Sequence, residues 1–301
     1  MKICADVGGS FIDIAVVDEN ASIHHRKKVP TPTGDWDAFV SVFADFQSDF
    51  ASQLRGGDPI SIAFAGLAAP DTGIMTSANI ECIHGRPLAR DLAAALGRPV
   101  FVINDADAFV LAEAVMGVAQ GHRRVFGLIL GTGVGGGLIE DGRIVTGPSG
   151  IGGEWGHGQI MIPTPKAPDA VPVFECGCGR KGCLDTIGGA RGLERLHQFL
   201  HDHTAKSSQI TASWEEGDAM ATATIDYFCD ILAGSLAMIL NTYPATVVPV
   251  GGGLSNSAAL IRELDQRVRR DMLDPPAHPI LVATLLGGNA GLLGAALAAD
   301  Q

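Results

Sequence analysis

The chain has 301 residues, of which 47% are hydrophobic, and its 21 Lys and Arg against 33 Asp and Glu give a formal net charge of −12. A chain of this length can bury a large core and is expected to divide into two domains. The acidic excess argues against nucleic acid as a partner, because few cationic groups remain to displace counterions from a polyanion. Asp6 and Gly8 interrupt the first apolar stretch, and no 18-residue uncharged apolar run follows. We therefore expect a cytoplasmic protein with no membrane partner.

Two stretches of the chain repeat one pattern of strand, glycine turn and strand. In the first, the sequence predicts strands at 3–7 and 12–17 around Gly8-Gly9-Ser10, and a third strand near residue 23. In the second, strands at 125–130, 138–139 and 143–145 are separated by a glycine turn at 131–137 and by a turn at 140–142. Gly8 lies ten residues before Asp18, as Gly131 does before Asp141. The repetition predicts a duplicated unit with one copy in each half.

Helices are predicted between and after these strands. Apolar residues at three- and four-residue spacings, together with proline near the start or glycine after the end, indicate helices at 36–54, 87–97, 104–119, 189–203, 218–240, 257–273 and 288–299. An apolar strand is expected at 246–250, between two of these helices. Strands mixed with helices predict the α/β class.

Three glycine clusters each follow a predicted strand. Glycine lets a backbone approach a phosphate closely and point N–H groups at it, and the carboxylate of Asp6 could hold the hydration shell of a magnesium ion. The clusters therefore predict a nucleotide site made of Asp6, Gly8, Gly9, Ser10, Gly131, Thr132, Gly133, Gly135, Gly251, Gly252, Gly253 and Leu254. Residues 131–136 match the dinucleotide-binding pattern G-x-G-x-x-G, but that fingerprint must open a helix, and a strand is predicted here. The chain has no Gly-Lys pair, which excludes a P-loop.

A histidine and three closely spaced cysteines form the most specific signal in the chain. Cys176, Cys178 and Cys183 lie within eight residues among glycines, and His157 is the nearest fourth ligand. Four nitrogen and sulfur ligands suit structural zinc, which keeps no open coordination position. The alternative, unliganded thiols on a surface loop, would leave them open to oxidation without any packing role.

These motifs, in this order, resemble the ROK family of bacterial sugar kinases and repressors, within the larger superfamily of actin, hsp70 and sugar kinases. The resemblance spans residues 3–296 and rests on Asp6-x-Gly-Gly-Ser10, Asn104-Asp105, Gly131-Thr132-Gly133-x-Gly135, Gly153-Glu154-Trp155-Gly156-His157 and Cys176-Gly-Cys-Gly-x-x-Gly-Cys183. Within the family, the segments 29–32, 78–88 and 127–137 are most similar to bacterial N-acetyl-D-glucosamine kinases, with fructokinases and glucokinases close by.

The resemblance implies a duplicated actin-like ATPase fold of the ribonuclease H-like type, in which two domains flank a cleft for nucleotide and sugar. The smaller lobe is expected at 1–118, completed by the C-terminal helix at 288–301. The larger lobe is expected at 119–287 and holds the zinc-binding loop.

The resemblance also implies roles for individual residues. Asp105 would be the catalytic base, although Asn-Asp before a helix is by itself ordinary N-terminal capping. Residues implied to bind the sugar are Asn79, Asn104, Asp105, Glu154, His157 and Asp185. His157 would use one ring nitrogen for zinc and offer the other to the sugar.

The sequence departs from the family pattern at positions that bear on the substrate. Asp185 stands where the family usually has glutamate, so its contact with the sugar is expected to be lengthened or bridged by water. Ser10 replaces a threonine and keeps the hydroxyl group. Gly288-Asn289 stands where relatives commonly carry Gly-Asp.

The resemblance implies ATP-dependent phosphorylation of the 6-hydroxyl of an amino sugar or hexose, with N-acetyl-D-glucosamine first, and with Mg²⁺ and structural Zn²⁺ as cofactors. Glucokinase or fructokinase activity is the alternative within the family. A sugar-responsive regulator or a non-catalytic sugar-binding protein is the alternative from another class. Repressors of the family carry an N-terminal helix-turn-helix ahead of the first strand, and with that strand predicted from Ile3 we expect no such module here. Family analogy implies a homodimer.

No catalytic or metal-binding role is predicted for the remaining cysteines and histidines. Cys4, Cys82 and Cys229 lie in apolar segments and are expected in the core. The other histidines are expected on the surface, including His24, His25, His197, His201 and His203.

Overall fold

The computed structural model describes residues 1–77, 79–147, 150–158 and 172–300, which form two compact units. The first unit comprises Met1–Ala112, Gly142–Gly152 and Gly288–Gln301, and the second comprises Glu113–Asp141 and Gly153–Gly287. These bounds differ from the predicted lobes at two places. Residues 113–118 belong to the second unit. There the buried Glu113 carboxylate accepts hydrogen bonds from the hydroxyl of Thr284 and the backbone N–H of Val118. Residues 142–152 belong to the first unit.

The sheet of the first unit has the strand order β3-β2-β1-β4-β7. Strands β1 (Lys2–Val7), β2 (Phe11–Val17) and β3 (Ile23–Pro30) are antiparallel neighbours, whereas β4 (Ile60–Phe64) and β7 (Val100–Asn104) run parallel to β1. The short strands β5 (Leu67–Ala68) and β6 (Met75–Thr76) pair separately. The helical elements of this unit are α1 (Trp36–Asp49), η1 (Glu81–Ile83), α2 (Leu88–Leu96) and α9 (Ala290–Ala298).

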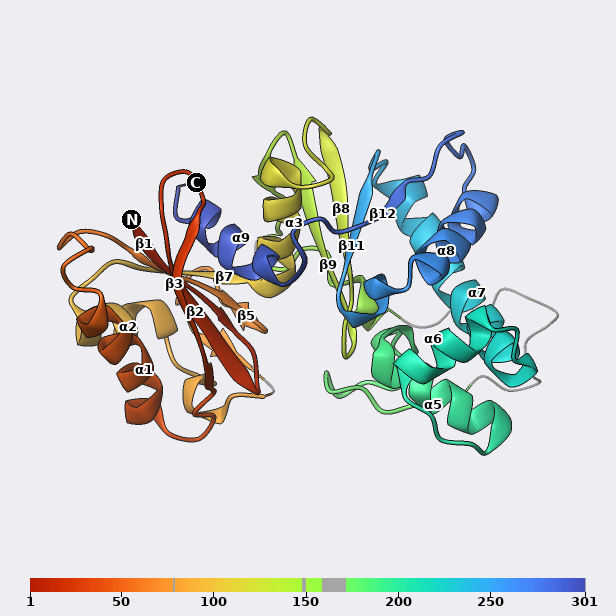
Figure 1. Ribbon diagram of the computed structural model, residues 1–301, viewed down its shortest axis with the longest axis horizontal. Coiled ribbons are helices and arrows are strands. Elements are labelled where there is room, and N and C mark those ends of the chain that lie inside the picture. The colour runs from red at the N-terminus through yellow and green to blue at the C-terminus, as the bar shows by residue number, and fades with distance from the viewer. Residues whose placement is uncertain (78, 148–149, 159–171, 301) are drawn as a thin grey trace. The chain divides into compact units, whose positions relative to one another are not determined.

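Helices cover both faces of this sheet (Figure 1). Side chains alternate along a strand, so Ile3, Ala5 and Val7 pack in one core with the phenylalanines of α1 and the leucines of α2. The intervening residues face α9, where Lys2 donates to the carbonyl of Ala296 at 2.7 Å. Burial on both faces explains why the first strand is almost continuously apolar.

The other five-stranded sheet has the order β10-β9-β8-β11-β12, and all of its strands except β10 belong to the second unit. Its strands are β8 (Arg124–Leu130), β9 (Val134–Glu140), β10 (Arg143–Ile144), β11 (Val248–Gly251) and β12 (Leu281–Ala283). The helical elements between β10 and η4 are η2 (Trp155–His157), α4 (Asp185–Gly188), α5 (Ala190–His201), α6 (Ser207–Glu215), α7 (Ala219–Thr242), η3 (Gly253–Asn256) and α8 (Ala258–Asp271). The short helix η4 (Gly287–Asn289) spans the boundary between the units. Helix α3 (Asp105–Met116) contains the boundary between the two units.

The two sheets confirm the predicted duplication. In each, the first strand of the repeat pairs antiparallel with the next strand and parallel with a later one, so β1, β2 and β4 correspond to β8, β9 and β11. Each antiparallel pair is joined by three residues, Gly8–Ser10 in one and Gly131–Gly133 in the other. The chain therefore builds the same mixed sheet twice.

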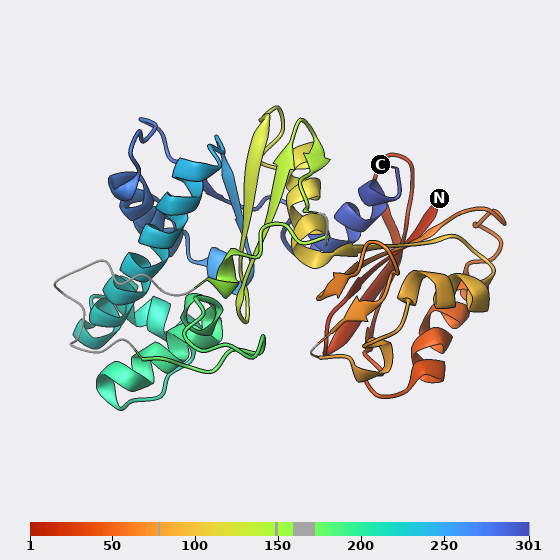
Figure 2. The same ribbon diagram turned by 180° about the vertical axis from the view of Figure 1, so that it is seen from behind.

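Helix α7 is the core helix of the second unit and packs beside α8 (Figure 2). Among the described residues it is long and apolar enough to cross a membrane by length and composition, but 72% of that apolar window is buried inside the structure. Burial against neighbouring helices accounts for its apolar character.

The remaining cysteines and histidines mostly lie where the sequence placed them, with one exception. Cys4 and Cys229 are fully buried, and Cys82 is half-buried. His197, predicted on the surface, is instead 4% exposed. The reason is its contact with α7, where its Nδ1 lies 2.9 Å from Oγ1 of Thr224.

Candidate functional site

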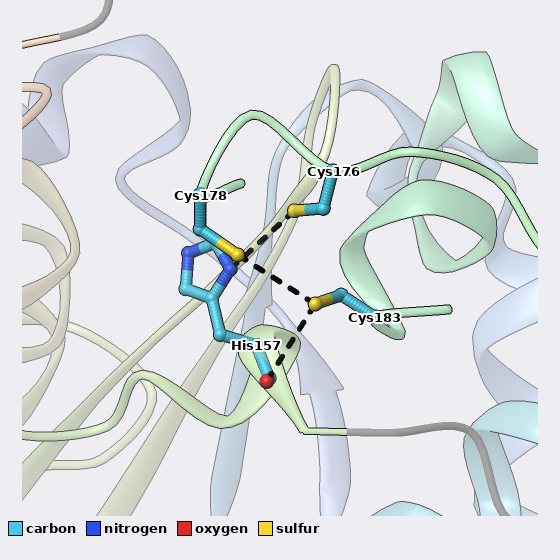
Figure 3. Close-up of side chains that lie close together, drawn as sticks. All are labelled: His157, Cys176, Cys178 and Cys183. Carbon is cyan, nitrogen blue, oxygen red and sulfur yellow. Dashed lines mark hydrogen bonds between the residues drawn. The ribbon is translucent and has the colours of Figure 1, made fainter. Parts of the chain in front are cut away.

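The predicted zinc ligands converge on one point. The ligand atoms of His157, Cys176, Cys178 and Cys183 all lie within 4.8 Å of one another (Figure 3). His157 Nδ1 is 3.6 Å from Sγ of Cys176, and Sγ of Cys178 is 3.7 Å from Sγ of Cys183. In tetrahedral zinc with Zn–S bonds of about 2.3 Å and Zn–N bonds of about 2.0 Å, neighbouring ligand atoms lie roughly 3.5 to 3.8 Å apart. The donor set and its spacing therefore fit structural zinc.

Turns in the cysteine-rich loop bring the thiols together. The Cys176 N–H donates to the carbonyl of Arg180 at 2.8 Å, and the Gly182 N–H donates to Phe174 at 2.9 Å. Gly179 and Gly182 have φ angles of +85° and +72°, a left-handed conformation that favours glycine. The glycines of the motif thus shape the loop around its cysteines.

The three thiols differ in their readiness to ionise. A hydrogen bond from the Arg180 backbone lowers the pKa of Cys178 to about 7, while burial raises the pKa of Cys183 to about 12 and also raises that of Cys176. Cys178 is the exposed member of the cluster. A metal ion that binds here must displace protons from the two buried thiols.

The second ring nitrogen of His157 faces a carboxylate. Its Nε2 lies 3.5 Å from Oε2 of Glu154, three residues earlier in the chain. This is the ring nitrogen that the resemblance implied would be available to a sugar, and it lies beside Glu154, another predicted sugar ligand. Burial raises the pKa of Glu154, and the nearby His157 acts in the opposite direction. A carboxylate behind a ligating histidine orients the ring, which suits a histidine held by metal.

Asp185 links the cysteine loop to the glycine turn between β8 and β9. Its Oδ1 accepts a hydrogen bond from the backbone N–H of Val134 at 2.8 Å, and its Oδ2 lies 3.9 Å from Sγ of Cys176. A Cβ at Gly133 would come within 2.2 Å of the same carboxylate. Asp185 thus has partners within its own unit.

Two of the three predicted nucleotide clusters come together in the second unit. Gly252, at φ +84°, lies so close to the end of β8 that a Cβ would be 2.4 Å from the Leu130 carbonyl and 2.6 Å from the Gly131 nitrogen. The third cluster, around Gly8–Ser10, lies in the first unit.

The turn in the glycine-rich segment 131–137 is shorter than the sequence predicted. Only 131–133 form the turn, and the rest of the run, including Gly135, belongs to strand β9. The physical reason is close packing: a Cβ at Gly136 would lie 2.6 Å from Cδ1 of Trp155 and 2.8 Å from the Gly153 carbonyl.

Asp6 lies at the end of β1, opposite Asp13 in the β1–β2 register. Burial raises the pKa of Asp6 to about 6, with a further contribution from Asp13. Arg26 bonds to Asp13 and donates to Oδ1 of Asn289 at 2.6 Å. Asp13 and Arg26 were not predicted from the sequence, although pairing the strands across the Gly8–Ser10 turn places Asp13 beside Asp6.

Asn104 and Asp105 stand at the junction of β7 and α3. Asn104 caps the helix, because its Oδ1 accepts from Ala106 N at 2.8 Å and Asp107 N at 3.2 Å. Its Nδ2 donates to the carbonyl of Gly66 at 3.0 Å. Asp105 is the first helical residue, where its Oδ1 also accepts from Ala106 N, at 2.9 Å.

Asn79 belongs to the same unit and lies against the first glycine turn. A Cβ at Gly9 would be 3.0 Å from Cβ of Asn79. Of the predicted sugar ligands, Asn79, Asn104 and Asp105 thus fall in the first unit, whereas Glu154, His157 and Asp185 fall in the second.

Comparison with known proteins agrees with the resemblance seen in the sequence. The family model described as "ROK family" matches residues 2–301. The chain is 36% identical over 298 residues to the N-acetyl-D-glucosamine kinase of Escherichia fergusonii, covering 97% of this chain and 96% of that protein. The corresponding kinase of Salmonella gallinarum is 34% identical with the same coverage.

Solved structures agree on the fold. The ROK hexokinase of Thermus thermophilus is 31% identical with a TM-score of 0.83, covering 98% of this chain and 96% of that one. A ROK family glucokinase from Streptomyces griseus, in complex with glucose and AMPPNP, is 26% identical with a TM-score of 0.80, covering 99% and 98%. A ROK family transcriptional regulator shares the fold at 23% identity and a TM-score of 0.79. The fold is therefore the actin-like ATPase fold of the ROK sugar kinases, and the chain belongs to the ROK family.

Proposed function

We propose that this ROK protein is an ATP-dependent sugar kinase that phosphorylates the 6-hydroxyl of N-acetyl-D-glucosamine. The structural observation that carries the proposal is the position of Asp105 at the first residue of α3, where its carboxylate can serve as a proton acceptor. The choice of sugar is supported by relatives named N-acetyl-D-glucosamine kinase, which match 97% of the chain. Glucokinase or fructokinase activity is the alternative within the family.

In the proposed reaction, Asp105 accepts the proton of the sugar hydroxyl as that oxygen bonds to the terminal phosphorus of ATP, and the bond from this phosphorus to the bridging oxygen breaks to release ADP. Transfer of a phosphoryl group depends mainly on positioning and on stabilisation of charge. Asn104 helps to fix Asp105, because its capping bonds hold the first turn of α3 and its amide group is tied to Gly66. Asn79, Glu154 and His157 are proposed to bind sugar hydroxyls.

The nucleotide is proposed to contact the glycine clusters. The N–H groups of Gly8 and Gly131 already donate to the carbonyls of Phe11 and Gly133, both at 3.0 Å. The later N–H groups of the two turns, at residues 9–10 and 132–133, would donate to phosphate oxygens, and Gly251–Leu254 would accommodate the adenosine end. A Mg²⁺ ion bound with ATP would neutralise charge on the phosphates, and Asp6 is the residue proposed to hold its hydration shell.

The cluster of His157 and the three cysteines is proposed to hold structural Zn²⁺. With four protein ligands the metal supplies no open position for the reaction. A homodimer in the cytoplasm remains part of this proposal, on the ground of family analogy.

A coupled ADP-release assay tests the proposal. Purified protein with Mg²⁺ and ATP would be given N-acetylglucosamine, N-acetylmannosamine, glucose, mannose or fructose in parallel. We expect the highest kcat/KM with N-acetylglucosamine. A higher value with glucose or fructose would select the alternative kinase, and equal failure with all five sugars would reject the kinase proposal. Sugar binding without any turnover would support the non-catalytic alternative.

A further inference from the structure

Asp185 connects two parts of the second unit that are far apart in the sequence. Its Oδ1 accepts from the backbone N–H of Val134, 51 residues away, at 2.8 Å. The carboxylate fits there only because Gly133 has no side chain, since a Cβ would lie 2.2 Å from Oδ1. Val134 directly follows the Gly131–Gly133 turn. The carboxylate therefore holds the peptide group that joins Gly133, the last residue of the turn proposed to bind phosphate, to strand β9.

The residues that follow Asp185 hold the rest of the same turn. The N–H of Ala190 donates to the Gly131 carbonyl at 2.8 Å, and the N–H of Arg191 to the Thr132 carbonyl at 3.3 Å. Gly189 lies so close that a Cβ would be 2.6 Å from Cα of Gly133. The orientation of the turn's peptide groups thus depends on the segment 185–191.

The start of that segment is in turn tied to the metal cluster. Asp185 is two residues after Cys183, and the intervening Leu184 donates its N–H to the carbonyl of Gly158, next to His157, at 2.9 Å. Sγ of Cys183 also lies 3.7 Å from the backbone oxygen of His157. A metal that binds His157 and Cys183 would fix both sides of this junction.

Other contacts of the cysteine loop are weaker anchors. The ion pair between Lys181 and Glu175 is exposed, and exposed pairs contribute little to stability. Cys178, near the middle of the loop, is exposed as well. The junction at 183–185 is also anchored by the buried side chain of Leu184, which packs in the core of the second unit. A metal ion would add a restraint at His157 and Cys183, and its removal would loosen the junction at these two residues.

We propose that Asp185 is a positioning residue that transmits metal occupancy of the cluster to the glycine turn, so that zinc binding raises the affinity for nucleotide. The inference rests on the proposed function in one respect, namely that the turn at Gly131–Gly133 binds nucleotide phosphates. The sugar contact predicted for Asp185 from the sequence stays a separate prediction. Aspartate, one methylene shorter than the glutamate usual in the family, places its carboxylate on the Val134 amide.

Hydrogen exchange followed by mass spectrometry tests the coupling without any nucleotide. Peptides covering 131–137 would be compared in zinc-loaded and zinc-depleted wild-type protein, and in an Asp185→Ala variant. We expect metal removal to speed exchange in the wild type at least tenfold, and exchange in the variant to be fast with or without metal. Exchange that is unaffected by metal in the wild type would overturn the proposal.

Calorimetric titration with AMP-PNP and Mg²⁺ measures the consequence for binding. We expect Asp185→Ala and zinc depletion each to weaken binding about tenfold, and the two changes together to weaken it little further. Asp185→Asn retains an oxygen acceptor for the Val134 N–H and should restore affinity to within about threefold. Asp274→Ala removes an exposed aspartate of the same unit and is the matched control.

The outcomes separate the two proposals. If Asp185→Ala binds AMP-PNP as tightly as wild type, the role of Asp185 is refuted. It is refuted as well if zinc depletion weakens AMP-PNP binding by the same factor in Asp185→Ala as in wild type. If zinc-loaded wild type binds no AMP-PNP while exchange still responds to metal, the nucleotide assignment of the turn fails although the coupling exists. Should Asp185→Ala fail to fold, wild type and Asp185→Asn with and without zinc still decide the question.

Discussion

Gly291 lies directly against Asp6, so that a Cβ at position 291 would come within 2.3 Å of the Asp6 Oδ2 atom. The contact joins the carboxylate at the end of β1 to the second residue of α9, near the opposite end of the chain. We expect Gly291→Ala to lower the free energy of unfolding by about 1–3 kcal/mol, because a methyl group here must displace the carboxylate or the helix. Urea denaturation measures the effect.

Gly288 supplies the matched control for that substitution. Among the residues that the structure describes, no heavy atom beyond Gly288 and its chain neighbours lies within 4 Å of a Cβ built at Gly288, which belongs to the same C-terminal segment. Gly288→Ala should therefore be nearly neutral. Equal stability of the two variants would show that the space around Asp6 is not as tight as described.

Asp105→Asn tests the proposed base. The amide cannot accept the sugar proton, so we expect kcat to fall by about 10²–10⁴-fold while sugar binding measured by calorimetry changes little. Asp37→Asn alters an acidic residue in the first turn of α1, in the same unit, and should leave kcat unchanged. A kcat for Asp105→Asn close to that of wild type would remove Asp105 from the mechanism.

Substitutions of Asn104 separate its capping role from its proposed contact with the sugar. Asn104→Ala removes the cap of α3 and should destabilise the protein by about 0.5–2 kcal/mol. Asn104→Ser restores a capping oxygen but not the Nδ2 donor to Gly66. We expect the serine variant to recover most of the melting temperature while KM for the sugar stays raised. Recovery of both would mean that Asn104 acts through the helix alone.

The buried His197 predicts a loss of stability in mild acid. Burial lowers the pKa of His197, and His201 and His203 lower it further, while Asp218 has a smaller opposing effect. The unfolded chain, with a histidine pKa of about 6.5, therefore binds more protons than the folded chain below that pH. The stabilisation is present above pH 6.5 and declines as the pH falls from there toward the lowered folded pKa.

Urea midpoints at pH 7.5 and 5.5 measure this dependence. We expect the drop between the two pH values to be smaller in His197→Gln, which cannot take up the proton but can still bond to Thr224. His278→Gln, at an exposed position, should behave like wild type. An unchanged drop in His197→Gln would assign the acid sensitivity to other groups.

Metal analysis checks the cluster itself. We expect about one zinc per chain in wild type and little or none in Cys183→Ser, because a structural site needs all four ligands. Cys82→Ser changes a half-buried cysteine outside the cluster and should keep its zinc. Full zinc content in Cys183→Ser would show that the metal, if present, is bound elsewhere.

The features that the sequence made predictable are those encoded by short spacings. The repeat from Gly8 to Asp18 and from Gly131 to Asp141 correctly predicted two sheets of the same topology. The cysteine motif correctly predicted the convergence on His157. Strand alternation and turn residues act over a few positions, so a single sequence reveals them.

The features that were missed depend on contacts between distant segments. The burial of His197 requires Thr224 on α7, and the bond from Val134 to Asp185 spans 51 residues. The strand at 134–137 was read as a turn because glycine is unusual in strands, and only the packing of Trp155 on Gly136 explains it. Helix α6 (Ser207–Glu215) was not predicted, since its apolar residues are few and only Ile210 and Thr211 are buried.

Product identification by ³¹P NMR is the most direct test of the central claim, that Asp105 takes the proton from the 6-hydroxyl of N-acetylglucosamine during transfer from ATP. Wild-type protein with Mg²⁺ should convert ATP and the sugar to ADP and a single phosphate monoester at C6, and Asp105→Asn should form it at least 10²-fold more slowly. A phosphate on another hydroxyl, or equal rates for the two proteins, would contradict the account.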